Sequence, residues 1–586
     1  MFKIFKYLKP KEWGAIAFSL IFIVIQVWLD LRLPDYMSKI TTLTQTPGND
    51  VKEILIQGVY MLLCTLGSLI SAVIVGYFAS RIGSAFAQRL RSMMFNKVVS
   101  FSMEEINMFS TPSLITRSTN DIIQVQMLLI FAMQLILKAP IMAVWAIAKI
   151  AGKGTEWTIT TGIAVGIVFV MVIFLMIFAV PKFRKMQVLT DNITRVSREN
   201  LTGVRVVRAY NAEKYQEEKF EVANNDLTSN QMFAALSMSV MMPVMSSVMG
   251  GLSLAIYWVG AYLIDKADVA DKLPVFSDMI VFMQYSVQVI MAFMMLVMIF
   301  VMMPRAGVSA RRINEVLDTQ SNLKDGNKTE GQSGLSGEIE FKNVGFKYPD
   351  ADEPVLENIS FTAKKGQTVA FIGSTGSGKS TLVNLILRFF DATDGEILVD
   401  GVDVKEYKME NLLNKIGYVP QKAVLFQGSV IDNVAYGDNG RNNFTVDNVK
   451  FAVDIAQGKD FVEKMDGGYD ADISQGGTNI SGGQKQRLSI ARAVCRQPEI
   501  YIFDDSFSAL DYKTDSVLRK TLKEKTQGIT TLIVAQRIGT IIDADSIVVL
   551  DEGRVVGIGT HRELLKNCDV YKEIAMSQLS EEELSA

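Results

Sequence analysis

The residues best suited to chemistry form a glycine-rich loop that ends in a lysine: Gly373, Ser374, Thr375, Gly376, Ser377, Gly378, Lys379, Ser380 and Thr381. An apolar run, Thr368–Ile372, precedes this loop, and a helix is predicted after it over Thr381–Phe390. Glycines let backbone N–H groups close around phosphate oxygens, and the start of a helix adds a favourable dipole. In this context we expect Lys379 to hold nucleotide phosphates and the Ser380 hydroxyl to bind Mg²⁺.

An acidic pair ends a second apolar run. Ile500–Phe503 reads as a buried strand, and Asp504 and Asp505 follow it directly. A carboxylate at the end of a neighbouring strand suits the Mg²⁺ shell of a phosphate-binding loop, through water. Asp504 is therefore the second predicted element of the site.

The string Ile480-Ser-Gly-Gly-Gln-Lys-Gln-Arg487 resembles the signature motif of ATP-binding cassette (ABC) proteins, and it lies about 20 residues before Asp504. Other family positions match as well: Tyr348 the adenine-stacking aromatic, Gln421 the loop glutamine, and Asp511 the loop that contacts a second cassette. The resemblance implies ATP and Mg²⁺ as cofactors. It implies a nucleotide site made by Tyr348, the loop residues 373–381, Gln421 and Asp504, with Ser380, Gln421 and Asp504 around the metal.

In the family, two cassettes meet head to tail. The resemblance therefore implies that Ser481, Gly482, Gly483 and Gln484 act on ATP held by a partner chain. A serine followed by glycines at a helix start suits the γ-phosphate of that nucleotide.

Two catalytic positions depart from the family pattern. Asp505 stands where the family normally has Glu, and Gln536, in Val534-Ala-Gln-Arg537, stands where it has a switch His. Aspartate is shorter by one methylene, about 1.5 Å, and a misplacement near 1 Å can cost about 100-fold in rate. Glutamine does not titrate near neutral pH. His561 is no replacement, and we expect it to be a structural surface residue.

An intact signature loop beside an altered hydrolytic pair resembles the weakened chain of heterodimeric bacterial multidrug exporters. This interpretation predicts a second ABC half-transporter as partner and slow hydrolysis at this chain's own site. The alternatives are a slow but working enzyme, a homodimeric lipid or peptide exporter, and a non-transporting ATP-gated regulatory subunit.

The elements that must position these residues fall into two domains. A membrane span needs about 20 largely apolar residues. We expect a transmembrane domain over residues 1–318, a polar linker over 319–336 and an ATP-binding cassette over 337–586. Six helices are expected at about 13–34, 54–80, 122–150, 157–180, 230–264 and 277–304. The predicted fold class is thus a helical membrane domain, with helices extended into the cytoplasm, followed by an α/β P-loop NTPase domain.

The distribution of Lys and Arg predicts the orientation. Basic residues such as Arg89, Arg91, Lys185 and Arg198 crowd the loops after the second and fourth spans. Because cytoplasmic loops carry this excess, both termini are expected in the cytoplasm, and the compact chain favours a bacterial inner membrane. Within those loops, Leu114–Asp121 and Arg198–Gly203 resemble segments around the family's coupling helices.

The composition argues against nucleic acid as a partner and against some kinds of structural site. The net charge is −3, from 59 basic and 62 acidic residues, so no basic excess exists to meet nucleic acid. Three cysteines and one histidine argue against a disulfide scaffold and a multi-histidine metal site.

Fourteen of the 30 methionines lie between Met232 and Met303, a flexible apolar wall that suits small amphipathic substrates or ordinary packing against helices and lipid. Polar residues in or near the spans are candidate functional residues: Gln26, Asp30, Arg32, Gln134, Lys138, Gln284 and Gln288. The alternative for Asp30, Arg32 and Lys138 is a position near water at the span ends.

Overall fold

The computed structural model describes residues 2–45, 50–151, 154–269, 271–349, 351–437 and 444–579. The chain divides into two compact units. One contains Met1–Val99 and Pro112–Thr319, and the other contains Ser100–Thr111 and Gln320–Ala586. Each unit is described separately below.

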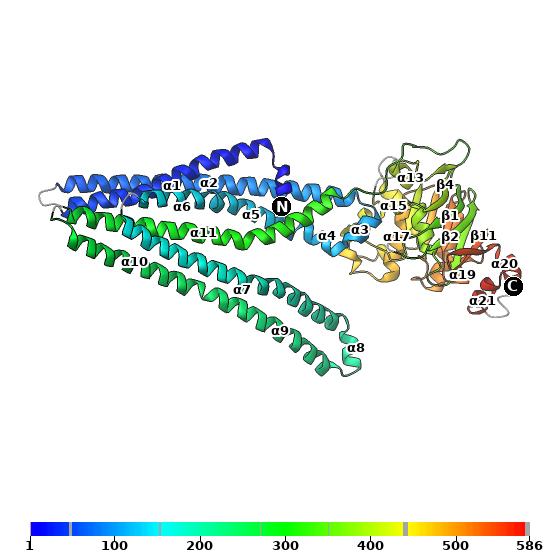
Figure 1. Ribbon diagram of the computed structural model, residues 1–586. Coiled ribbons are helices and arrows are strands. Elements are labelled where there is room, and N and C mark those ends of the chain that lie inside the picture. The colour runs from blue at the N-terminus through cyan, green and yellow to red at the C-terminus, as the bar shows by residue number, and fades with distance from the viewer. Residues whose placement is uncertain are drawn as a thin grey trace. The chain divides into compact units, whose positions relative to one another are not determined.

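The first unit is helical (Figure 1). Its long helices are α1 (Pro10–Gln45), α2 (Val51–Val99), α5 (Asn120–Phe131), α6 (Lys138–Ala151), α7 (Thr155–Thr202), α9 (Glu213–Ser239), α10 (Met241–Lys266) and α11 (Lys272–Asp318). Short helices α4 (Thr111–Ser118) and α8 (Val204–Ala209) lie between them. Six helical stretches in the described residues are long and apolar enough to cross a membrane, which confirms the predicted number.

The helices differ from the predicted ranges in length and continuity. α1 begins earlier and ends later than 13–34, and α2 and α11 continue well past the apolar windows, because a helix does not stop where its side chains become polar. The predicted helix 122–150 is interrupted by a π-helical turn, Ala132–Ile136. Pro140 lacks the N–H that would bond to the carbonyl of Ile136, which explains an irregular turn here. The predicted helix 230–264 crosses the boundary between α9 and α10, where Val240 keeps helical dihedral angles (φ −67°, ψ −24°).

The second unit is built on a six-stranded sheet with the order β12-β11-β3-β10-β9-β6. Its strands are β3 (Thr368–Gly373), β6 (Ile416–Val419), β9 (Ile500–Asp504), β10 (Thr530–Val534), β11 (Ser546–Asp551) and β12 (Arg554–Gly559). All neighbours are parallel except β12, which pairs antiparallel with β11. Apolar runs such as Ile500–Phe503 are buried on both faces, as expected for parallel strands.

A smaller antiparallel sheet and a set of helices complete this unit. The sheet has the order β2-β1-β4-β5, from β1 (Ile339–Phe346), β2 (Leu356–Ala363), β4 (Asp394–Val399) and β5 (Val402–Asp403), and β7 (Gly428–Ser429) pairs with β8 (Asp472–Ile473). The helices are α3 (Met103–Phe109), α12 (Lys379–Ile386), α13 (Met409–Asn414), α14 (Val430–Val434), α15 (Val446–Ile455), α16 (Lys459–Val462), α17 (Gly482–Cys495), α18 (Tyr512–Lys525), α19 (Ile538–Ile541), α20 (His561–Asn567) and α21 (Asp569–Met576). α12 ends four residues before the predicted Phe390.

The polar segment 319–336 is fastened along the cassette. The backbone N–H groups of Gly326 and Lys328 donate to the carbonyls of Tyr407 and Glu406, and that of Gln332 donates to the carbonyl of Asp400. At its start, the buried Glu105 carboxylate on α3 accepts hydrogen bonds from Ser321 and Asn322. This polar, glycine-rich segment is therefore held in place by hydrogen bonds along its length.

Candidate nucleotide site

The predicted site residues meet at one edge of the six-stranded sheet. The glycine-rich loop follows β3, Asp504 and Asp505 end β9, Gln536 follows β10, and Gln421 follows β6. These four strands are adjacent and parallel, so their carboxyl ends lie at the same edge. Residues more than 150 positions apart in sequence are thereby brought together.

The glycine-rich loop closes tightly at its end. Gly378 has φ +92°, and a Cβ there would lie 2.5 Å from the Leu356 side chain, so glycine is needed. The buried Lys379 amine donates to the carbonyls of Gly373 (2.9 Å) and Ser374 (2.6 Å) and to the Ser377 hydroxyl (3.2 Å). Burial lowers the pKa of Lys379, while the nearby Asp505 and Asp504 carboxylates oppose that effect. An ammonium held inside its own loop is placed to bind phosphate oxygens.

Ser380 and Asp504 form the candidate metal position. The Ser380 Oγ donates to Asp504 Oδ1 at 3.0 Å. A hydroxyl and a carboxylate side by side, next to a phosphate-binding loop, are the oxygen ligands that Mg²⁺ prefers. The donor set therefore fits a nucleotide with Mg²⁺.

The two altered positions contact each other. Asp505 Oδ2 accepts hydrogen bonds from Gln536 Nε2 (2.9 Å) and from Gln421 Nε2 (3.2 Å). Asp505 adopts φ +46°, a left-handed conformation that Asp tolerates better than most residues. Burial raises the pKa of the Asp505 carboxyl, and the hydrogen bond from Gln421 opposes that shift. The carboxylate is thus fixed between two amides.

The signature residues lie on a different element, where Ser481 and Gly482 are exposed and Gly483 and Gln484 are half-buried. Ser481 caps α17: its Oγ accepts from the Gln484 N–H, and Gln484 Oε1 accepts from the Ser481 N–H at 2.9 Å. Gly482 and Gly483 form the first turn of this helix. Among the described residues, the hydrogen bonds of the Ser481 side chain are those of this cap, and none joins it to the loop 373–381. Asp511, the predicted dimer-contact residue, caps α18 by accepting a hydrogen bond from the Thr514 N–H at 3.0 Å.

Tyr348 contacts the end of the loop 373–381, and its role in stacking on adenine stays a prediction. The Tyr348 hydroxyl lies 3.1 Å from the Thr381 hydroxyl, and its ring packs edge-on against Phe346 and Phe390. The prediction that His561 lies on the surface is wrong. Its side chain is buried, and Nδ1 lies 2.7 Å from the Tyr571 hydroxyl, because α20 and α21 pack together there.

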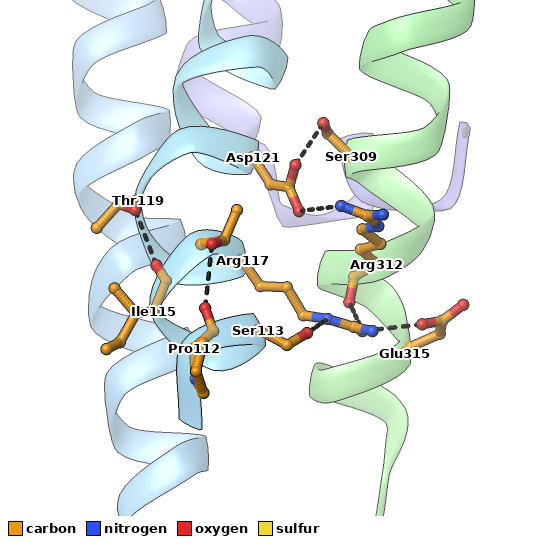
Figure 2. A network of polar contacts seen from close by, with 10 residues as sticks. Pro112, Ser113, Ile115, Arg117, Thr119, Asp121, Ser309, Arg312 and Glu315 are labelled. Atoms are coloured by element: carbon orange, nitrogen blue, oxygen red, sulfur yellow. Dashed lines mark hydrogen bonds and ion pairs between the residues drawn. The ribbon is translucent and has the colours of Figure 1, made fainter. Parts of the chain in front are cut away.

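The predicted coupling segment is tied to the last membrane helix (Figure 2). Arg117 on α4 donates to the Arg312 carbonyl (2.9 Å) and to the Glu315 carboxylate (2.8 Å) on α11. The buried Asp121 on α5 accepts from the Ser309 hydroxyl at 2.7 Å. Sequence reasoning missed Ser309, Arg312 and Glu315. Their spacing of three residues, which puts them on one helix face, is the signal that could have found them.

Polar residues inside the membrane helices form ion pairs. Lys138 Nζ lies 3.2 Å from Asp30 Oδ2, and Lys149 Nζ lies 2.7 Å from Asp35 Oδ2. The Tyr285 hydroxyl also donates to Asp35. These contacts join α1 to α6 and α11, which compensates charge where water is scarce.

Comparison with known proteins places this architecture in a family. Residues 356–508 match the model of the ABC transporter, and residues 16–302 match that of the ABC transporter transmembrane region. The chain is 39% identical to an uncharacterized ABC transporter ATP-binding protein of Mycobacterium tuberculosis over 96% of each chain. It is 33% identical to YfiB of Bacillus subtilis, an uncharacterized ABC transporter ATP-binding protein, over 99% of each.

Two further matches have names that describe what those proteins do. An ATP-dependent lipid A-core flippase of Aliivibrio fischeri is 33% identical over 68% of each chain. The structure of a bacterial Atm1-family ABC exporter with ATP bound superimposes with a TM-score of 0.80 at 24% identity, covering 97% of this chain and 99% of that one. This chain therefore belongs to the ABC transporter family and has the fold of its exporters, a six-helix membrane domain joined to an ABC ATPase domain.

Proposed function

We propose that this chain is one half of an ATP-driven exporter that moves amphipathic compounds, drugs among them, out of the cell by alternating access. Its own nucleotide site hydrolyses ATP slowly, and its signature loop completes a faster site on a different partner chain. Both termini lie in the cytoplasm, and the membrane is the bacterial inner membrane.

One observation carries this proposal: Asp505 is held between Gln421 and Gln536 in place of the family's Glu–His arrangement. The two amides hold the carboxylate in position, but neither titrates near neutral pH, and aspartate leaves that carboxylate about 1.5 Å short of the reach of the family's Glu. Lys379, Ser380 and Asp504 retain the groups for binding ATP with Mg²⁺. When bound, Mg²⁺ would neutralise charge on the phosphates. The site is therefore suited to holding ATP more than to cleaving it.

The intact cap of α17 supports the other half of the proposal. Ser481 is exposed and followed by two glycines, so its hydroxyl and the adjacent N–H groups are open to a nucleotide on another chain.

A repaired variant tests the slow-site proposal. Asp505→Glu combined with Gln536→His should raise the ATP turnover of the purified chain about tenfold or more, because the carboxylate moves forward by about one methylene and a titratable base returns. Lys379→Ala in the same background is the matched control and should abolish the gain. An unrepaired chain that already turns over as fast as the repaired one would contradict the proposal.

A second candidate is a homodimeric lipid exporter. The lipid A-core flippases among the relatives support it, since those proteins are ATP-dependent and share about a third of their residues with this chain over the matched region. Vesicles containing the purified chain alone distinguish the two. ATP-dependent movement of a labelled lipid by this chain alone favours the homodimer, whereas dye efflux that requires a second chain favours the heterodimer.

A further inference from the structure

The loop that carries Gln536 has little support from regular structure. It spans Ala535–Arg537, between the end of β10 and the start of α19. The Ala535 N–H donates to the Phe371 carbonyl at 3.1 Å, and the Gln536 side chain reaches Asp505. Arg537, at the N-cap position of α19, gives that helix no side-chain cap. The backbone after Gln536 therefore needs another partner to fix its position.

Gln578, just after the end of α21, supplies that partner. Its Nε2 donates to the Gln536 carbonyl at 2.8 Å, and its Oε1 accepts from the Ile538 N–H at 2.8 Å. One side-chain amide thus bonds the backbone on both sides of Arg537, in the way that a neighbouring strand would. It also satisfies the otherwise uncapped N–H at the start of α19.

Gln578 is itself held by a buried helix. Tyr571 and Ala575 on α21 are fully buried, and the Tyr571 hydroxyl contacts His561 on α20. The Gln578 side chain is exposed, but its backbone position is set by the packing of α21 against the core. The C-terminal helix is thereby connected to the hydrolytic loop through one amide.

We propose that Gln578 is a positioning residue for ATP hydrolysis: it fixes the backbone of Gln536 so that the Gln536 amide stays on Asp505. The contacts that would hold ATP, made by the loop after β3, belong to different elements and do not involve Gln578. Loss of the Gln578 side chain should therefore slow turnover without weakening ATP binding. This inference concerns the chain's own ATPase site and is independent of whether the partner is a second copy.

Gln578→Ala and Gln578→Asn in the full-length protein test this assignment, with ATP turnover and hydrogen exchange of the segment around Ile538 as readouts. Two lost hydrogen bonds predict that kcat falls about fivefold to tenfold, with KM for ATP unchanged within about twofold. The Ile538 amide should exchange faster, because its acceptor is gone. Asparagine is one methylene too short to bridge both groups and should behave like alanine.

Met576→Ala is the matched control, since Met576 is exposed at the end of the same helix. It should change neither readout. Gln578→Glu keeps the acceptor for Ile538 but places a carboxylate against the Gln536 carbonyl, so it should keep slow exchange at Ile538 and lower kcat. Unchanged exchange at Ile538 in Gln578→Ala, or faster exchange with wild-type kcat in both the parent and the Asp505→Glu/Gln536→His background, would overturn the assignment. A loss of ATP binding would do so as well.

Discussion

Gln536, one of the two altered positions, donates a hydrogen bond to the carboxylate of Asp505, the other one. The Gln536 amide can donate to it at 2.9 Å at any pH near neutrality, because an amide does not titrate. A histidine in that place would change its charge near pH 6.5. With glutamine at position 536, Asp505 therefore has a hydrogen-bond donor that does not titrate, where a histidine would be a partner that does.

His561, the single histidine of the chain, is expected to make the stability of the cassette depend on pH. Burial lowers the pKa of its imidazole, and the neighbouring Arg562 lowers it further. The unfolded chain therefore binds a proton more readily than the folded chain, so stability is full above about pH 6.5 and falls as pH drops through the lowered folded pKa. Scanning calorimetry of the full chain should show this fall.

His561→Gln keeps a hydrogen-bonding group for Tyr571 but does not titrate. Its unfolding temperature should decline less steeply between pH 7 and pH 5.5 than that of the parent. Equal slopes for the two proteins would show that His561 is not responsible.

Among the elements, α4 contacts α11, the last membrane helix (Figure 2). Arg117→Ala removes its hydrogen bonds to Arg312 and Glu315 and should reduce ATP-dependent transport several-fold, while ATP hydrolysis changes less. The reason is that α4 loses its fixed position against α11 while the nucleotide site keeps all of its groups. Arg305→Ala, which removes an exposed arginine from α11, is the control. Parallel losses of transport and hydrolysis would contradict this role.

The pair Asp30–Lys138 links α1 to α6, and both side chains are largely buried. Lys138→Met leaves Asp30 without its cation and should destabilise the detergent-purified protein by about 3 kcal/mol or more. The reason is that the carboxylate of Asp30 would then be a largely buried charge without an opposite charge beside it. Asp30→Asn with Lys138→Met should recover most of the unfolding temperature. Lys39→Met, at an exposed position on α1, should have little effect. A double variant as unstable as the single one would refute the pairing argument.

At the scale of the whole molecule, the question is which chain completes which site. A surrogate partner can be made from this chain by introducing Asp505→Glu and Gln536→His in one copy and purifying mixed pairs through two different tags. In such a pair, Ser481→Ala in the unaltered copy should remove most of the ATP turnover, since its signature loop would serve the repaired site.

Lys379→Ala in the unaltered copy should leave most of that turnover, because it affects only the slow site. The proposed division between the two sites therefore predicts unequal effects of two substitutions in one chain. Equal losses would contradict it.

Much of the site was predictable from short-range patterns. The loop 373–381, the acidic end of β9 and the signature string each occupy a few consecutive residues, and a backbone loop that holds phosphate needs a local sequence. Hydropathy likewise determined the number of membrane helices, because lipid demands about 20 apolar residues for each crossing. Where the helices end was not determined, since a helix continues into water without its apolar side chains.

Tertiary structure decided the pairings. That Gln536 contacts Asp505, that Gln578 holds the backbone of Gln536, and that Arg117 meets Glu315 depend on strand order and helix packing. The burial of His561 depends on how α20 and α21 pack. The sequence by itself determined which chemical groups are present and which short segments present them. Only the fold decided which distant groups share a hydrogen bond, because such a bond requires two side chains within about 3 Å and sequence order does not encode that distance.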